Sequence, residues 1–185
     1  MRPTPAALLL ALALAVPASW AADPAAIRQQ IENGELTAAQ QQVDAELAQR
    51  PDDPQYRFFR GVILGAESKD DQAIAIFKDL TVRYPELPEP YNNLAVVYAR
   101  EGRYDEARQA LEMAVRANPD YATALENLGD VDARLAARSY RKALRLAPAD
   151  AARIEAKVGA IDRMLGAAGE LAGTVSLPLP AAGKH

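Results

Sequence analysis

The sequence predicts an all-α protein, a short right-handed α-solenoid of about three to four helix pairs followed by a C-terminal capping helix. The first observation is a proline that returns every 34 residues, at Pro51, Pro85 and Pro119, and again at Pro148 after a shorter interval. The second is an alanine at a matching distance before each proline, at Ala39, Ala73, Ala107 and Ala136. A period of this length predicts units that each bury an apolar face against the next unit.

Residues 88–121 form the clearest unit, and their apolar pattern predicts two helices. The first half has the i, i+3, i+4, i+7 spacing of an amphipathic helix, at Tyr91, Leu94, Ala95 and Tyr98. The second half has apolar residues four and three apart, at Ala107, Leu111 and Ala114. Gly102 lies between the halves and can adopt the positive φ that ends a helix. Pro119 ends the second helix because it cannot donate the next backbone hydrogen bond.

This unit closely resembles the tetratricopeptide repeat, a helix-turn-helix module of 34 residues. The residues that carry the resemblance are Tyr91, Leu94, Ala95, Tyr98, Gly102, Ala107, Leu111, Ala114 and Pro119. It implies an array over residues 23–148, with repeats near 20–53, 54–87 and 88–121 and a shortened repeat at 122–148. It also implies that the first helix of each pair lines a concave surface that holds a protein or peptide partner.

The second repeat departs from the pattern. Arg57 and Arg60 occupy places where the third repeat has buried residues, while Phe58, Phe59 and Val62 fall on what should be the opposite face. Two arrangements fit this pattern. Either the helix docks in a rotated position, or an apolar patch is exposed.

The fourth repeat is about five residues short and lacks a counterpart of the Gly102 turn. No glycine or proline interrupts the chain between Asp130 and Ala147, so we expect one continuous helix near Ala122 to Leu146. The alternative is a tight hairpin near Leu135 to Ser139. In a continuous helix one face would be shared by Leu125, Leu128, Gly129, Asp132, Ala136, Tyr140, Ala143 and Leu146.

The C-terminal part predicts a capping helix over residues 149–166 and a flexible tail over 167–185. Asp150 can cap this helix, and Gly166 can end it after about Leu165. The helix has an apolar stripe at Ile154, Val158, Ile161 and Leu165, with which it would cover the last repeat. In the tail, apolar residues alternate at Val175, Leu177 and Leu179, so a docked strand or self-ligand is the alternative.

Residues 1–21 predict a cleaved secretory signal peptide. Arg2 precedes an apolar run from Ala6 to Val16, and the small-residue pattern that follows permits cleavage before Ala22. An uncleaved anchor or a short buried helix would be the alternatives. We therefore expect an exported bacterial protein of the periplasm, with secretion from the cell left open. The chain has no cysteine, so it forms no disulfide.

A candidate peptide-binding groove follows from the places that face away from the buried stripe. Asn93 and Asn127 stand 34 apart, as do Arg100 and Arg134, and each pair should project from neighbouring helices. Amides suit a peptide backbone and arginines suit a carboxylate. One alternative is that the asparagines only stabilise the repeats. Another is that Phe58 and Phe59 pack against the first repeat. The full set is Phe58, Val62, Asn92, Asn93, Val96, Arg100, Asn127, Asp130 and Arg134.

Two features argue against other ligands. The carboxylate clamp of chaperone adaptors in this family uses basic residues at two inner-face places, and those places hold no basic residue here. The formal net charge of −4, without a basic run, disfavours binding to nucleic acid or to an anionic membrane.

No pattern of a catalytic, metal or cofactor site is present in the sequence. The one histidine is His185, and no phosphate-binding loop, nucleophile motif or metal-ligand cluster occurs. The sequence therefore predicts a non-enzymatic scaffold that binds a protein or peptide in the bacterial cell envelope and needs no cofactor. The alternatives are a self-associating structural element, such as a homodimer, or an enzyme of unrecognised class.

Overall fold

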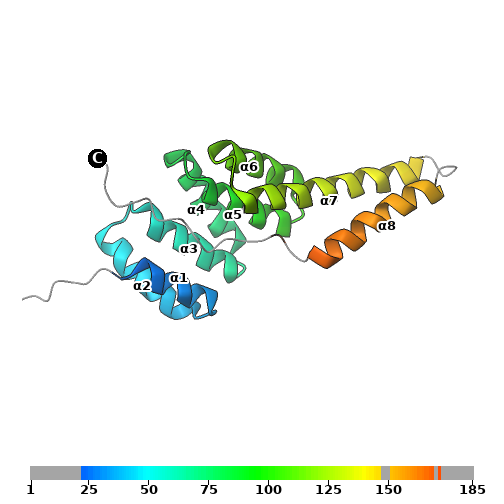
Figure 1. The fold of residues 1–185 in the computed structure, drawn as a ribbon. Coiled ribbons are helices and arrows are strands. Elements are labelled where there is room, and N and C mark those ends of the chain that lie inside the picture. The colour runs from blue at the N-terminus through cyan, green and yellow to red at the C-terminus, as the bar shows by residue number, and fades with distance from the viewer. Residues whose placement is uncertain (1–21, 147–150, 169–170, 172–185) are drawn as a thin grey trace, which may run out of the picture.

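The computed structural model describes residues 22–146, 151–168 and 171, and the fold over these residues is all α-helical. Six helices form three antiparallel pairs, followed by two longer helices (Figure 1). Their bounds are α1 Pro24–Glu32, α2 Leu36–Gln49, α3 Pro54–Ala66, α4 Asp70–Arg83, α5 Pro88–Arg100, α6 Tyr104–Ala117, α7 Ala122–Leu146 and α8 Ala151–Ala168.

The helices form two layers of a solenoid. Within the described residues, α1, α3, α5 and α7 each contact the next helix of that series, whereas α2, α4 and α6 contact only their sequence neighbours. The first helices of the pairs are therefore the closely spaced inner layer, and the second helices are the outer layer. This spacing gives the curvature that the repeat period predicts.

The same turn joins the two helices of each pair. Gly34, Ser68 and Gly102 have positive φ angles of 78°, 59° and 74°. The residue after each one donates its backbone N–H to a carbonyl five residues back, with N–O distances of 2.8 to 2.9 Å. This is the hydrogen bond of a Schellman motif, which satisfies the last carbonyls of the helix. The predicted role of Gly102 is thus confirmed.

The core lies between the layers, and small residues allow the close approach of the helices in it. An ideal Cβ built on Gly61 of α3 would stand 2.7 Å from Cε1 of Phe77 and 3.2 Å from Cγ2 of Ile76 on α4. Ala39, Ala73, Ala107 and Ala114 have no exposed surface. The recurring small residues of the sequence are therefore sites of helix-helix contact.

Helix α3 is buried on both sides, which excludes the exposed patch considered for the second repeat. Phe58 is fully buried with its ring 5.7 Å from that of Phe77, and Phe59 is 2% exposed. Arg57 instead reaches Asp79 at 2.8 Å, and Arg60 pairs with Asp44. An inner helix between two helix pairs packs on both of them, so a single apolar stripe does not describe it.

Helix α7 is one continuous helix of 25 residues, so the hairpin near residues 135–139 is wrong. Its predicted face is also wrong, because Leu125 is 46% and Leu146 is 75% exposed. The buried residues are Ala124, Asn127, Val131 and Ala137. The first half of α7 packs on α5 and α6 and the second half on α8. The buried face therefore changes along the helix.

Helix α8 packs back along α7 and on no other helix of the described chain. It therefore packs on α7, the helix that forms the shortened last repeat, and leaves the other helices of both layers uncovered. With the outer half of α7 it forms a two-helix projection, here called the arm (residues 133–146 and 151–168; Figure 1). Ile154 is buried and the rest of its predicted stripe is half-buried.

Some sequence expectations concern the end of α8, and others fall on residues outside the described part of the chain. The helix continues to Ala168, so Gly166 does not end it and residues 167–168 do not belong to a tail. Residues 1–21, the predicted cap Asp150 and residues 172–185 lie outside the described residues. Among the described helices, none combines the length and the apolar character that a membrane crossing requires.

Candidate functional site: the inner face of the solenoid

Buried polar side chains mark the inner face of α5, and one of them bonds to α7. Asn92 and Asn127 are at most 1% exposed, and Nδ2 of Asn127 donates to Oδ1 of Asn92 at 2.8 Å. Asn93 is 6% exposed and donates from Nδ2 to the backbone oxygen of Glu89 at 3.0 Å. Here this row, Glu89, Asn92, Asn93 and Asn127, is called the polar row.

Glu89 is the unusual member of the polar row. Its side chain is 3% exposed, and its Oε2 atom has no hydrogen-bond partner among the described residues. Burial raises the pKa of this carboxyl above its ordinary value because desolvation disfavours the charged form. An unpartnered buried carboxylate oxygen is an acceptor that a donor from a ligand could satisfy.

The structure brings two of the predicted asparagines together. Asn127 donates to Asn92, which stands 35 positions earlier, one position more than the repeat distance of 34 that separates Asn127 from Asn93. Neighbouring helices meet through side chains that are offset along the helix axes. Positions related by the repeat period therefore do not have to face each other.

Phe58 and Val62 lie at different depths. Phe58 is fully buried against Phe77, so it packs inside and is not a surface anchor for a ligand. Val62 is partly buried and packs against the same core. The alternative from the sequence was that the phenylalanines pack against the first repeat; the ring contact of Phe58 is with Phe77, in the second helix of its own repeat.

The two predicted arginines both have carboxylates of the chain nearby. Arg100 at the end of α5 forms a salt bridge with Asp70, the first residue of α4. Arg134 lies 4.0 Å from Asp130, one turn earlier on α7. A ligand carboxylate would therefore compete with these acidic residues for the two guanidinium groups.

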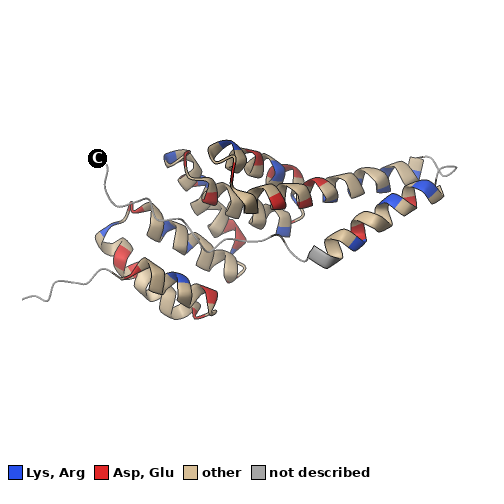
Figure 2. Cartoon of the chain, viewed as in Figure 1, with Lys and Arg blue, Asp and Glu red and all other residues tan. Residues whose placement is uncertain are grey.

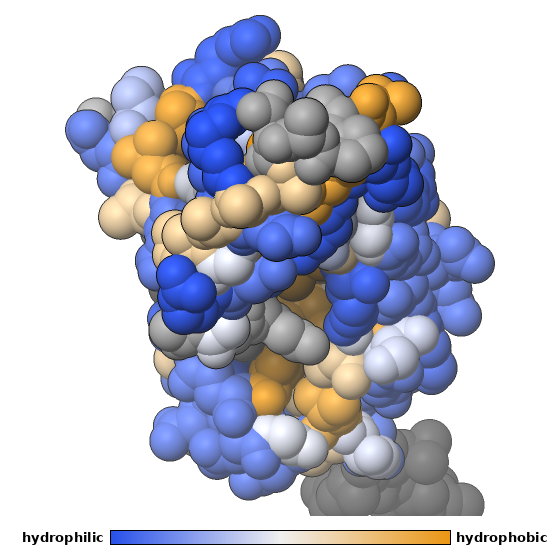
Figure 3. All heavy atoms as spheres, turned by 90° about the vertical axis from the view of Figure 1, so that its right-hand side faces the viewer, coloured by the Kyte–Doolittle hydropathy of each residue, from blue (hydrophilic) through white to orange (hydrophobic). Residues whose placement is uncertain are grey.

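A hollow of about 230 Å³ opens beside the polar row. It is lined by Val96, Ala99, Arg100, Tyr104, Arg134 and Leu171, and we call it the leucine hollow. Val96 lies seven residues after Glu89 on α5, so both share one face of the helix two turns apart. Figure 3 views the molecule from the arm side and shows apolar surface gathered in a recess with hydrophilic residues on both sides.

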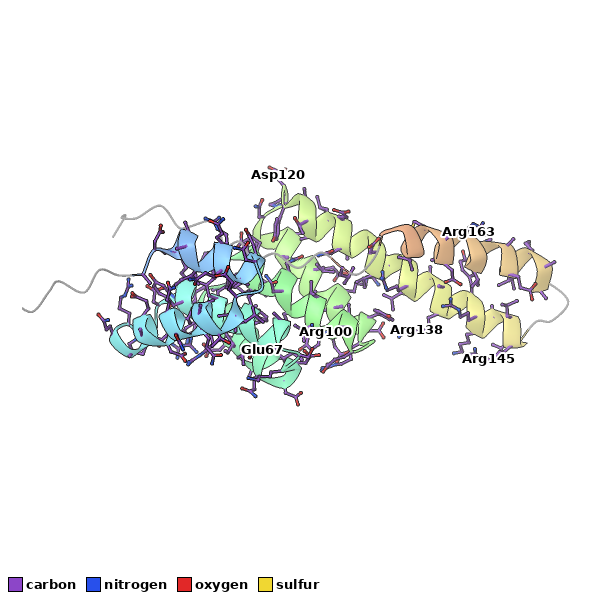
Figure 4. The ribbon with its side chains drawn as sticks, turned by 90° about the horizontal axis from the view of Figure 1, so that it is seen from below. Glu67, Arg100, Asp120, Arg138, Arg145 and Arg163 are labelled. Carbon is purple, nitrogen blue, oxygen red and sulfur yellow. The ribbon has the colours of Figure 1, made fainter. Side chains whose placement is uncertain are left out.

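A second hollow, of about 280 Å³, runs along the arm. It is lined by Tyr104, Arg134, Ala137, Arg138, Arg141, Arg145 and Leu165. Tyr104 and Arg134 line both hollows, which therefore adjoin. Figure 4 shows Arg138 and Arg145 on α7 and Arg100 at the end of α5, near the base of the arm.

The arm carries an excess of positive charge (Figure 2). Its described basic residues are Arg134, Arg138, Arg141, Lys142, Arg145, Arg153, Lys157 and Arg163, against two acidic residues, Glu155 and Asp162. Arg138 binds Asp105 at 2.8 Å and Arg141 binds Asp162 at 2.6 Å. Salt bridges within the chain thus hold two of the arginines of the arm, Arg138 and Arg141.

The sequence did not point to Tyr104 and Leu171 of the first hollow or to Arg138, Arg141 and Arg145 of the second, whereas Arg134, which lines both, was in the predicted set. The arginine row was visible as residues four, three and four apart, at Arg134, Arg138, Arg141 and Arg145. Nothing local marks Leu171, which is brought to the hollow by the fold of the arm. Among the described residues, no group of three or more acidic, histidine or cysteine side chains could hold a metal ion.

Stacked antiparallel helix pairs with a polar inner face define an α-solenoid repeat protein. Two family models, both described as tetratricopeptide repeat, match residues 25–88 and 66–129. Together they cover residues 25–129, and the chain belongs to the tetratricopeptide-repeat proteins.

Two known proteins are similar to parts of this chain. The tetratricopeptide repeat domain-containing protein PYG7, chloroplastic, of Arabidopsis thaliana is 47% identical over 45 residues, which are 24% of this chain and 15% of that protein. A solved structure titled "Structure of Naa15/Naa10 bound to HypK-THB" covers 78% of this chain with a TM-score of 0.55 and 16% identity. The match spans 24% of that solved chain, and at this identity it shows the fold alone.

Proposed function

We propose that this protein is a non-enzymatic scaffold that binds an extended peptide or protein segment along the polar row and the leucine hollow. The observation that carries the proposal is Glu89. Its buried Oε2 atom lacks a hydrogen-bond partner among the described residues, and Glu89 lies two helical turns before Val96, which lines the leucine hollow. A backbone N–H of a peptide would give this oxygen a donor.

The chemistry of the polar row fits a peptide backbone. An asparagine amide donates and accepts, so it can bind peptide groups whatever the peptide sequence. From Glu89 to Arg100 the helix rises about 16 Å, which matches about five extended residues. The adjoining apolar hollow would take one side chain, and such an anchor in a pocket contributes much of the affinity in many interfaces.

We also propose that the protein acts in the bacterial cell envelope, as the apolar run after Arg2 and the small-residue pattern before Ala22 suggest. Mass spectrometry of the protein purified from its own cells, combined with fractionation, tests this. We expect a chain that begins at Ala22 and is recovered with the periplasmic fraction. An intact chain that begins at Met1 in the cytoplasm would refute it.

The binding proposal is tested by crosslinking the protein in its own cells and identifying captured partners by mass spectrometry. The test variants are Glu89→Gln, which keeps the shape of the side chain, and Asn93→Ala. The control is Gln109→Ala on the outer helix α6, where the side chain is exposed. We expect the two inner-face variants to lose a partner that the control retains. Retention of every partner by all three variants would contradict the proposal.

The self-associating element is a weaker candidate. Such an element would associate through an incompletely capped end of the array, and Phe58, the residue whose change to aspartate was expected to dissociate a dimer, is fully buried inside the solenoid. Light scattering of the purified protein measures the oligomeric state directly. A stable dimer that survives dilution would revive this alternative.

A further inference from the structure

The arm brings the chain back to the solenoid. Helix α7 runs outward for 25 residues, and α8 returns along it for 18 residues (Figure 1). Leu171 follows α8 by three positions and forms part of the wall of the leucine hollow. A residue distant in sequence is thus placed against α5 and α6 because the arm is a hairpin.

Leu171 is held there by packing. Its side chain is 9% exposed and belongs to the same apolar cluster as the solenoid core. Val96 and Ala99 of α5, Tyr104 of α6 and the arginines Arg100 and Arg134 line the same hollow. The chain itself therefore supplies a branched aliphatic side chain that packs against the solenoid at this hollow.

We propose that the leucine hollow is the specificity pocket for a leucine-bearing peptide partner, and that Leu171 is an internal ligand which the partner must displace. This inference rests on the proposed peptide-binding function and adds to it the class of side chain that is bound and an autoinhibitory contact. Because Leu171 is tethered, its effective concentration at the hollow is on the order of millimolar. A partner that must displace Leu171 binds only the fraction of molecules in which Leu171 has left the solenoid, and its apparent affinity is weakened by that fraction.

The test measures binding of a synthetic fluorescent peptide of residues 167–180 of this chain to the full-length protein by fluorescence anisotropy. The receptors are the wild type, Leu171→Asp and Leu171→Ala. We expect the peptide to bind the Leu171→Asp protein at least about tenfold more tightly than the wild type, because the hollow is open. A peptide carrying Leu171→Asp should bind none of the receptors.

The control receptor is Met164→Asp. Met164 lies on α8, is 49% exposed and lines neither hollow, so this change should leave the affinity at the wild-type value. Circular dichroism monitors folding of each receptor. If the aspartate variant unfolds, the Leu171→Ala protein gives the same comparison with a smaller gain.

Three results would overturn the inference. They are equal affinity of the peptide for the wild type and for both Leu171 variants, equal binding of the leucine and aspartate peptides, and no binding to any receptor. If these results occur while Glu89→Gln and Asn93→Ala still lose the cellular partner, the inference fails and the proposed function stands. If the peptide binds as expected but those two variants retain every partner, the proposed function fails.

Discussion

Nδ2 of Asn127 donates to Oδ1 of Asn92 at 2.8 Å, and both side chains are buried between α5 and α7. This hydrogen bond joins the last regular repeat to the long helix that begins the arm. A buried amide is costly unless its donors and acceptor are bonded, so the pair sets the position of α7 on α5.

Removing one side of this pair should destabilise the protein. We expect Asn127→Ala to lower the free energy of unfolding by about 1–3 kcal/mol, because Oδ1 of Asn92 loses a donor in a buried place. The double variant Asn92→Leu with Asn127→Leu should recover part of the loss. Urea unfolding followed by circular dichroism measures both. An Asn127→Ala protein as stable as the wild type would show that the bond does not contribute to stability.

Gly61 should not tolerate even one methyl group. A Cβ there would stand 2.7 Å from Cε1 of Phe77, so we expect Gly61→Ala to cost about 1–3 kcal/mol through overpacking. Gly129 on α7 is the matched control, because no atom outside its own helix lies within 4 Å of its ideal Cβ. Gly129→Ala should stabilise the protein by about 0.5–1 kcal/mol through helix propensity. Thermal unfolding of both variants tests whether Gly61→Ala lowers the melting temperature while Gly129→Ala raises it.

Ser68 carries strain that glycine would relieve. It adopts a φ of 59° in the turn where the other pairs have Gly34 and Gly102. A left-handed conformation costs a non-glycine residue about 1 kcal/mol, so Ser68→Gly should raise the melting temperature modestly. The reciprocal change Gly102→Ser should lower it. A lower melting temperature for Ser68→Gly would mean that the serine makes a compensating contact in the turn.

Glu89 makes stability depend on pH in a defined direction. Because burial raises its pKa in the folded state, the folded protein binds more protons than the unfolded chain above the ordinary glutamate pKa. Its contribution to stability is therefore fully present below the ordinary pKa and is lost as pH rises through the folded-state pKa. Replacing the carboxyl by an amide removes this loss.

We therefore expect Glu89→Gln to be more stable than the wild type by about 1 kcal/mol at pH 7, with the difference shrinking at acidic pH. Urea unfolding of both proteins across the pH range measures this difference in the free energy of unfolding. The other titratable groups are the same in both proteins, so their contribution cancels in the difference. A difference that is constant with pH would exclude titration of Glu89 as its cause.

Helix positions and the solenoid class could be predicted from the sequence because both depend on local pattern. Helices α2, α4 and α6 each end two residues before a recurring proline, and the Gly102 turn ends α5. The candidate site was less predictable. Phe58 lies inside the core and Asn92 is fully buried, while Val96 and Arg134 line a hollow to which Leu171 also contributes without any local signal in the sequence.

The sequence by itself determined the helix pairs, their turns and the uninterrupted α7, since periodicity and helix breakers act within a few residues of chain. The tertiary structure decided which face of α3 and α7 is buried, which asparagines meet, and that Leu171 packs against the solenoid in the wall of the leucine hollow. Each of these depends on neighbours distant in sequence. Burial is a property of the surface that two elements share, and only their packing creates that surface.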